Sequence, residues 1–343
     1  MIIKSHSFLL YDSVSNIIIK LIVDRRGIRT MILSVSRRTD VPNYYSDWFF
    51  NRIKEKYVYV RNPMNPHQVS KIDISPEMVD CIVFWTKNPK PMLERLDELK
   101  GYNYYFQFTL TGYGNDIECN VPHKKEVMIP IFQELSRKIG KEKVIWRYDP
   151  IMFTETYTPE YHVKAFEQIA NALNGYTEKC VISFVDTYAK NKKSMTELGV
   201  KQLDKHQLFD FAKQLSRIAL KNNMAIGSCA EVIDLEQCGI SHNSCIDQEL
   251  IERIVGCKIN TSKDKNQRKE CSCIESVEIG TYNTCKNGCK FCYANYSQES
   301  VDKNCNKYNA MSPILCGEVT EYDKVNVRKI KSIREEQLSI FDI

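Results

Sequence analysis

The stretch ILSVSRRTD, residues 32–40, is a short apolar run followed directly by charged and polar residues. The run at 32–36 is too short for an independent helix and is typical of a buried strand. Strands that are apolar on both faces are characteristic of parallel sheets covered by helices. Five later runs have the same character: CIVFW at 81–85, YYFQFTL at 104–110, VIWRY at 144–148, VISFV at 181–185 and MAIGS at 224–228.

Amphipathic segments separate these runs. The clearest is 205–221, where apolar residues recur at helical spacing, and another helix is expected after KNPKPM, with Pro91 in its first turn. The alternation indicates parallel strands joined by right-handed crossovers, which form either a barrel or an open doubly wound sheet. We expect an α/β fold with a parallel (β/α) barrel, full or partial. Polar residues follow one predicted strand after another. This favours a barrel, because barrel active sites form at the carboxyl-terminal ends of the strands. For any single residue, a turn or a surface ion pair is the commoner explanation.

Eleven of the fourteen cysteines lie between Cys229 and Cys316. No export signal is visible, and clustered thiols in a reducing compartment more often bind metal or do redox chemistry than form disulfides. In TCKNGCKFCYAN, residues 284–295, Cys285, Cys289 and Cys292 form a C-x3-C-x2-C pattern. Three thiolates on one short loop suit a four-iron four-sulfur cluster with one iron open, whereas zinc usually takes four protein ligands.

This motif, with an aromatic residue before its third cysteine, resembles the cluster loop of radical S-adenosylmethionine enzymes. In that family the loop normally stands near the start of the barrel, so its place here implies a permuted strand order. SRRTDVP, FWTKNPKP, FQFTLTGYGNDIECNVP and VIWRYDPIM are loosely similar to later strands of spore photoproduct lyase-like enzymes. Residues 31–343 also resemble a bacterial domain-of-unknown-function family.

The resemblance implies a 4Fe-4S cluster that binds S-adenosylmethionine and, with an electron from a donor such as flavodoxin or ferredoxin, generates a 5′-deoxyadenosyl radical. The cofactors carry that chemistry and the barrel positions the substrate. No glycine-rich cofactor motif is visible in SVSRRTDVP, and no catalytic residue is assigned. The expected cofactor-binding residues are Arg37 or Arg38 for a carboxylate or phosphate, Asp40 or Asp149 for a ribose or amine, and Lys87 and Arg147 for an anion.

A second metal site is expected from Cys229, Cys245, Cys271 and Cys273, as a second iron-sulfur cluster or a zinc site. Other cysteines compete for this role, and free cysteine also serves as a small core residue. The competing thiols are Cys238, Cys257, Cys305 and Cys316.

Four regions are expected along the chain. Residues 1–30 are an extension, or an upstream start with Met31 as the initiator; 31–235 form the barrel; in 236–320 a Cys-rich segment returns TYNTC as a strand beside ILSVS; and 321–343 are a tail. No apolar stretch is long enough to span a bilayer or resembles a signal peptide, so we expect a cytoplasmic protein without membrane contact.

Net charge and the C-terminal tail are the two features that bear on binding partners. A net charge of +5 neither requires nor excludes nucleic acid. Gln337–Phe341 resemble the short peptide that docks on the DNA sliding clamp, so the clamp and DNA are expected partners. The alternative function is a zinc- or iron-sulfur-binding nucleic-acid-binding protein without radical chemistry.

Overall fold

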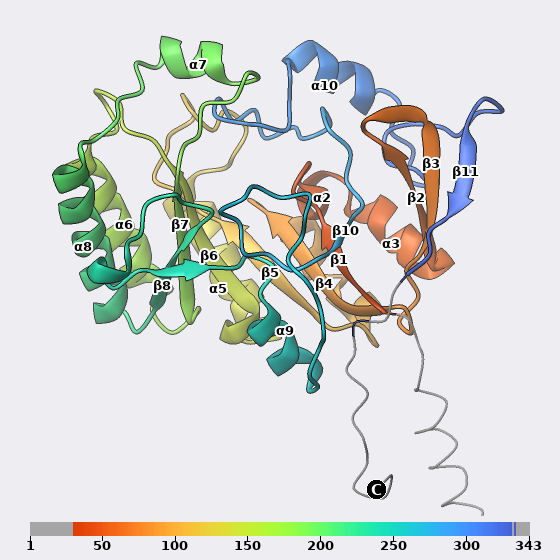
Figure 1. Cartoon of the computed structure of the whole chain (residues 1–343), viewed down its shortest axis with the longest axis horizontal. Coiled ribbons are helices and arrows are strands. Elements are labelled where there is room, and N and C mark those ends of the chain that lie inside the picture. The colour runs from red at the N-terminus through yellow and green to blue at the C-terminus, as the bar shows by residue number, and fades with distance from the viewer. Residues whose placement is uncertain (1–29, 331–332, 334–343) are drawn as a thin grey trace, which may run out of the picture.

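A parallel eight-stranded sheet forms the centre of the computed structural model, which describes residues 30–330 and 333 (Figure 1). All six apolar runs are strands of this sheet, and neighbouring strands pair in parallel. In spatial order the strands are β10 (Val277–Glu278), β1 (Met31–Val35), β4 (Val79–Thr86), β5 (Tyr104–Thr109), β6 (Val144–Ile151), β7 (Lys179–Phe184), β8 (Ala225–Cys229) and β9 (Ser241–Asn243).

The Cys-rich segment supplies the two outermost strands, β9 and β10. Within the described residues no backbone pairing joins these two strands, so the sheet is open between its two edge strands. Beside β1 lies β10, where Val277 pairs with Leu33, and not the expected TYNTC stretch. The chain leaves the sheet soon afterwards at Gly280, where a Cβ atom would stand 1.8 Å from the Ser36 hydroxyl. Only glycine permits this close crossing over the end of β1.

Helices α3 (Ser46–Glu55), α5 (Ile129–Ile139), α6 (Pro159–Leu173) and α8 (Lys205–Lys221) bury their apolar sides against one face of the sheet. Figure 1 shows α6 and α8 side by side there. The bounds of α8 are those expected from the sequence, and Asp204 and Gln207 form a capping box at its start. The helix after KNPKPM is a single turn, α4 (Lys90–Leu93).

The opposite face of the sheet is covered by α9 (Gln248–Val255) and by the Cys-rich segment. Ile32, Val83 and Tyr105 point to this side and pack against Leu250 and Ile251 of α9. The strands are therefore buried on both faces, which explains their continuous apolar character.

A three-stranded sheet lies to one side of α3 (Figure 1). It contains the hairpin β2 (Tyr57–Asn62) and β3 (Asn65–Asp73), and β11 (Lys324–Val327), which runs parallel to β3. The first part of the expected tail thus belongs to a sheet, whereas residues 1–29 and the clamp-like stretch 337–341 lie outside the described residues. None of the described helices is long and apolar enough to cross a membrane. The remaining helices are α2 (Val41–Tyr44), α7 (Lys192–Glu197) and α10 (Gln298–Cys305).

Candidate functional site

The three-cysteine loop, residues 284–295, is fixed at the carboxyl-terminal end of β1. The Tyr45 hydroxyl donates to the Thr284 carbonyl at 2.5 Å, and the Tyr44 hydroxyl donates to Asn287 Oδ1 at 3.0 Å. The Asn287 amide in turn donates to Asp40 Oδ2 at 3.0 Å. Because Asp40 and both tyrosines come directly after β1, these contacts place the loop at the edge of the sheet where α/β proteins form their sites.

Asp40 joins this loop to the end of β4. Its carboxylate accepts from the Thr86 hydroxyl at 2.7 Å, from Lys87 N–H at 2.8 Å and from Asn43 N–H at 3.2 Å, in addition to the amide of Asn287. Burial raises the pKa of Asp40, while these donors act against that shift. With both oxygens engaged, Asp40 acts as a positioning residue, whereas the sequence suggested a ligand for a ribose or an amine.

The segment that follows β5 holds the other side of the loop. Lys290 N–H donates to the Ile117 carbonyl at 3.0 Å, and Asn120 N–H donates to the Asn287 carbonyl at 3.1 Å. The Asn120 side chain adds a bond to the Lys286 carbonyl at 2.7 Å. The loop is therefore clamped between two strand ends of the sheet.

Gly288, inside the loop, has φ +66°, and a Cβ atom there would lie 3.2 Å from both Cys119 and Asn120 side-chain atoms. We expect Gly288→Ala to lower the free energy of unfolding by about 2 kcal/mol or more, from left-handed strain plus crowding. Gly199→Ala is the matched control, because Gly199 has φ +59° with no atom within 4 Å of the added Cβ, and about 1 kcal/mol is expected there. Urea unfolding measures both, and equal losses would contradict the close approach.

The three thiols of the loop lie close enough to influence one another. Burial raises the pKa of each, to about 12 for Cys285 and well above the ordinary value for Cys289, and neighbouring thiolates raise the pKa of Cys285 and Cys289 further. A bound cation would lower these pKa values, because it favours the deprotonated thiol. Three neighbouring thiols on one loop are the donor type that an iron-sulfur cluster uses.

Backbone N–H groups face two of these sulfurs. Those of Asn287 and Asp40 lower the pKa of Cys285, against the larger effect of burial. Ala294 N–H donates to Cys292 Sγ at 3.3 Å. Such N–H donors to sulfur are among the contacts that tune iron-sulfur clusters.

A buried ion-pair group, Lys87 with Glu118 and Lys124, stands beside Cys289. Lys87 Nζ lies 2.5 Å from Glu118 Oε1, and the other carboxylate oxygen pairs with Lys124. Burial alone would lower the pKa of Lys87, but Glu118 and Cys289 outweigh it and raise that pKa. Lys87 is therefore a fixed positive charge next to the loop and already has a protein anion as partner.

The second thiol cluster consists of Cys229, Cys245, Cys271 and Cys273. It lies on the face of the sheet that α9 covers. Cys229 Sγ lies 3.0 Å from Cys245 Sγ, and Cys273 contacts the thiols of both Cys245 and Cys271. Ile246 N–H donates to Cys273 Sγ at 3.3 Å. The competing thiols lie elsewhere: Cys305 and Cys316 are beside Tyr45, and Cys238 faces the Phe209 carbonyl.

No group of three or more His, Cys, Asp or Glu side chains among the described residues surrounds one point as ligands of a single ion do. In the second thiol cluster the sulfurs instead form a row, in which each contacts the next.

Arg147 and Arg37, expected to bind an anionic cofactor, are engaged by protein groups. Arg147 Nε donates to Asp149 Oδ2 at 2.9 Å and Nη1 to Cys245 Sγ at 2.6 Å, while Ser183 donates to Asp149. Arg37 Nη2 donates to Ser276 at 2.9 Å, and its guanidinium also approaches Asp264 and Glu278. These pairs hold the Cys-rich segment against the sheet. Asp149 is likewise no free ligand for an amine.

Arg38 and Lys190 differ from Arg37 and Arg147 because they contact an aromatic ring. Both stand over the ring of Tyr282, at 4.8 Å and 4.5 Å from its centroid, and the Arg38 guanidinium donates to the Gly280 carbonyl at 3.3 Å. Within the described part of the chain neither side chain forms an ion pair with a carboxylate. Lys190 also lowers the pKa of Cys292, although burial outweighs it. Uncompensated positive charge therefore borders the three-cysteine loop.

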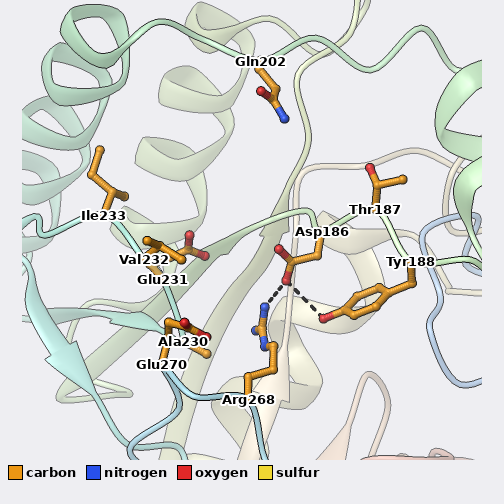
Figure 2. Close-up of a pocket in the computed structure, with 10 residues that line it drawn as sticks. All are labelled: Asp186, Thr187, Tyr188, Gln202, Ala230, Glu231, Val232, Ile233, Arg268 and Glu270. Atoms are coloured by element: carbon orange, nitrogen blue, oxygen red, sulfur yellow. Dashed lines mark hydrogen bonds and ion pairs between the residues drawn. The ribbon is translucent and has the colours of Figure 1, made fainter.

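A pocket of about 570 Å³ opens where β7 and β8 end (Figure 2). Arg268 and the Tyr188 hydroxyl both point to the Asp186 carboxylate in Figure 2. The wall opposite contains Glu231, whose Oε1 accepts from Phe184 N–H at 2.8 Å. The loop with Asp186 is tied to the three-cysteine loop through Asn191, whose amide donates to the carbonyls of Asp186 and Phe291.

Burial raises the pKa of Glu231 to about 7, from an ordinary value of 4.5. Because the folded pKa is the higher one, stability contributed by neutral Glu231 is full below pH 4.5 and is lost as the pH rises through 7. We expect Glu231→Gln to become more stable than wild type by roughly 2–3 kcal/mol at pH 8 relative to pH 4.5, by urea unfolding. Glu236→Gln, at an exposed position in the same loop, should follow the wild-type profile. A pH-independent difference for Glu231→Gln would contradict this assignment.

Several residues of the site carry no separate signal in the sequence. Glu118, Asn287, Lys190 and Arg268 gain their places only through contacts with distant segments. The polar stretch GYGNDIECNVP after β5 drew attention to the region of Glu118, although not to that residue itself.

Comparisons with known proteins give one family. A family model described as a domain of unknown function (DUF1848) matches residues 32–294, which include both cysteine groups. No curated protein matches the chain. A solved structure described as an endoglucanase is similar at 12% identity with a TM-score of 0.21, over 68% of this chain and 99% of that one. Likeness at this level carries no argument about fold or activity.

Proposed function

This chain belongs to the domain-of-unknown-function family DUF1848, and we propose that it is an iron-sulfur enzyme of the radical S-adenosylmethionine type. The observation that carries the proposal is the placement of Cys285, Cys289 and Cys292. These thiols are near enough to influence one another, in a loop whose Asn287 donates to Asp40, and Asp40 accepts from Thr86 at the end of β4. The C-x3-C-x2-C spacing supports the same centre.

The three thiolates would hold a four-iron cluster and leave one iron without a protein ligand. When bound and reduced by a donor such as flavodoxin or ferredoxin, this group supplies the electron that cleaves S-adenosylmethionine to methionine and a 5′-deoxyadenosyl radical. Backbone N–H groups of Asn287 and Ala294 would stabilise the thiolates. Lys87 would place a fixed positive charge beside Cys289.

Arg38 and Lys190 are the proposed anchors for the carboxylate of S-adenosylmethionine. They border the three-cysteine loop and, among the residues that the structure describes, form no ion pair with a carboxylate, unlike Arg37 and Arg147. A guanidinium binds a carboxylate through two parallel hydrogen bonds, which also fixes its orientation.

The sheet would act as a partial barrel. One face of the sheet is covered by α9 and other parts of the Cys-rich segment. Exclusion of water matters for a reaction of this type, because a reactive species must meet its substrate before competing donors. We place the substrate in the pocket between Asp186 and Glu231.

This pocket favours a small polar substrate over DNA. Three of its side chains are carboxylic acids, Asp186, Glu231 and Glu270, against one guanidinium, Arg268. Arg37 and Arg147, two of the basic residues after the strands, are neutralised by carboxylates. We expect weak DNA binding that falls steeply with salt, and clamp capture with and without Gln337–Phe341 tests the tail separately. Tight binding to DNA at physiological salt would reverse this choice.

Cofactor binding tests the proposal directly. Anaerobically reconstituted protein should bind S-adenosylmethionine in equilibrium dialysis, and Arg38→Ala should weaken that binding at least about tenfold, through loss of a charge-assisted bond. Arg217→Ala, at an exposed position of α8, should bind like wild type. Protein with a full iron complement that binds no S-adenosylmethionine would contradict the proposal.

A further inference from the structure

The second thiol cluster takes no part in the function proposed above. We propose that Cys229, Cys245, Cys271 and Cys273 are the ligands of a second metal centre, a four-thiolate site that holds an iron-sulfur cluster or a zinc ion. The proposal rests on these thiols and their surroundings, independently of the three-cysteine loop.

Three separate segments bring the four thiols together. Cys229 ends β8, Cys245 follows β9, and Cys271 and Cys273 belong to a stretch without regular structure. Free cysteine also serves as a small core residue, as Cys81 does between strand residues of the sheet. In the cluster, by contrast, each sulfur contacts another sulfur.

A guanidinium and two N–H donors surround the cluster. Arg147 is buried, and its permanently charged guanidinium lies 2.6 Å from Cys245 Sγ. The Asn243 amide and Ile246 N–H also point to sulfurs, at 3.7 Å from Cys245 and 3.3 Å from Cys273. Metal binding would deprotonate the four thiols, and the guanidinium of Arg147, itself shared with Asp149, would partly offset the negative charge of such a site.

The four sulfurs do not surround a common point, so metal binding requires this row of thiols to open. Two sulfurs at 2.3 Å from a tetrahedral zinc ion are about 3.8 Å apart, whereas the Cys229 and Cys245 sulfurs are 3.0 Å apart. Side-chain rotation at the loop positions would open the row of sulfurs around an ion or a cluster.

A metal here would also join the two walls of the pocket. Cys229 immediately precedes the lining residues 230–233, and Cys271 immediately follows Arg268 and Glu270. Common ligation of Cys229 and Cys271 would hold these walls at a fixed separation. The centre would therefore shape the site where we place the substrate.

The experiment isolates the second centre in full-length protein that carries Cys285→Ala, Cys289→Ala and Cys292→Ala. After anaerobic loading in separate arms with iron plus sulfide or with zinc, we expect about four iron and four sulfide, or about one zinc, per chain. Adding Cys245→Ser or Cys271→Ser should remove the metal, whereas Cys257→Ser, at a half-buried thiol of the same segment, should not. Metal should also protect the four ligand thiols from alkylation, as read by mass spectrometry.

Three results would overturn the proposal: a folded triple variant that binds neither iron nor zinc, metal that remains after Cys245→Ser, or a Cys229–Cys245 disulfide in place of bound metal. If the triple variant is insoluble, Cys245→Ser in the otherwise unchanged chain should lower the metal content, and an unchanged content would equally overturn the proposal. The triple variant lacks the first centre by design, so its metal content is unaffected by whether the chain cleaves S-adenosylmethionine.

Discussion

Replacing Cys289 with serine is expected to remove the first cluster and, with it, all detectable cleavage of S-adenosylmethionine. Cys289 is influenced by Lys87 and by the other two thiols, and its backbone is paired with Glu118. Serine keeps the size of the side chain and removes the soft thiolate that iron-sulfur clusters require. The iron content after anaerobic reconstitution should fall by about four per chain.

Cys119→Ser is the matched control for this change. Cys119 is exposed and lies against Gly288, so it is a nearby thiol outside the proposed ligand set. Its replacement should leave the iron content and S-adenosylmethionine cleavage as in wild type. Loss of the cluster in Cys119→Ser would mean a fourth protein ligand, and therefore no open iron. Full activity in Cys289→Ser would remove the three-cysteine loop from the reaction.

Glu118→Ala is expected to give the largest loss of stability. The Glu118 side chain is 1% exposed and neutralises Lys87 and Lys124, whose side chains are 12% and 19% exposed. Removing the carboxylate leaves two buried ammonium groups without their partner, which typically costs about 3–5 kcal/mol. The free energy of unfolding in urea measures this loss.

Two further variants keep this prediction specific. Adding Lys87→Met to Glu118→Ala should recover part of the loss, because one unpaired buried charge is removed with its partner. Glu126→Ala, at a side chain that is 77% exposed, should change the free energy of unfolding by less than about 1 kcal/mol. A Glu118→Ala protein as stable as the Glu126→Ala protein would show that the buried pair contributes little.

The central sheet was predictable because its strands carry their own signal. All six apolar runs are strands, since burial on both faces requires apolar residues at nearly every position. The helix at 205–221 was equally clear from its periodicity and its polar start. By contrast, β3 is largely exposed and polar, and β10 has only two residues, so neither has a pattern to read.

The sequence indicated which cysteines belong to the candidate site, but not which residues the strand-end charges contact. Cysteine spacing singled out the three-cysteine loop, and the four thiols chosen for a second site do lie together. The partners of the strand-end charges are long-range: Arg37 meets residues 264–278, and Asp40 meets Asn287. Local sequence does not encode such contacts, so residues expected to bind a cofactor proved to hold the Cys-rich segment to the sheet.

The most direct test of the central claim is the amount of 5′-deoxyadenosine formed when anaerobically reconstituted protein is mixed with dithionite and S-adenosylmethionine. We predict 5′-deoxyadenosine from the wild-type chain and from Cys119→Ser, and none from Cys289→Ser. No 5′-deoxyadenosine from wild-type protein with a full iron complement would contradict the account and favour an iron-sulfur or zinc protein without radical chemistry.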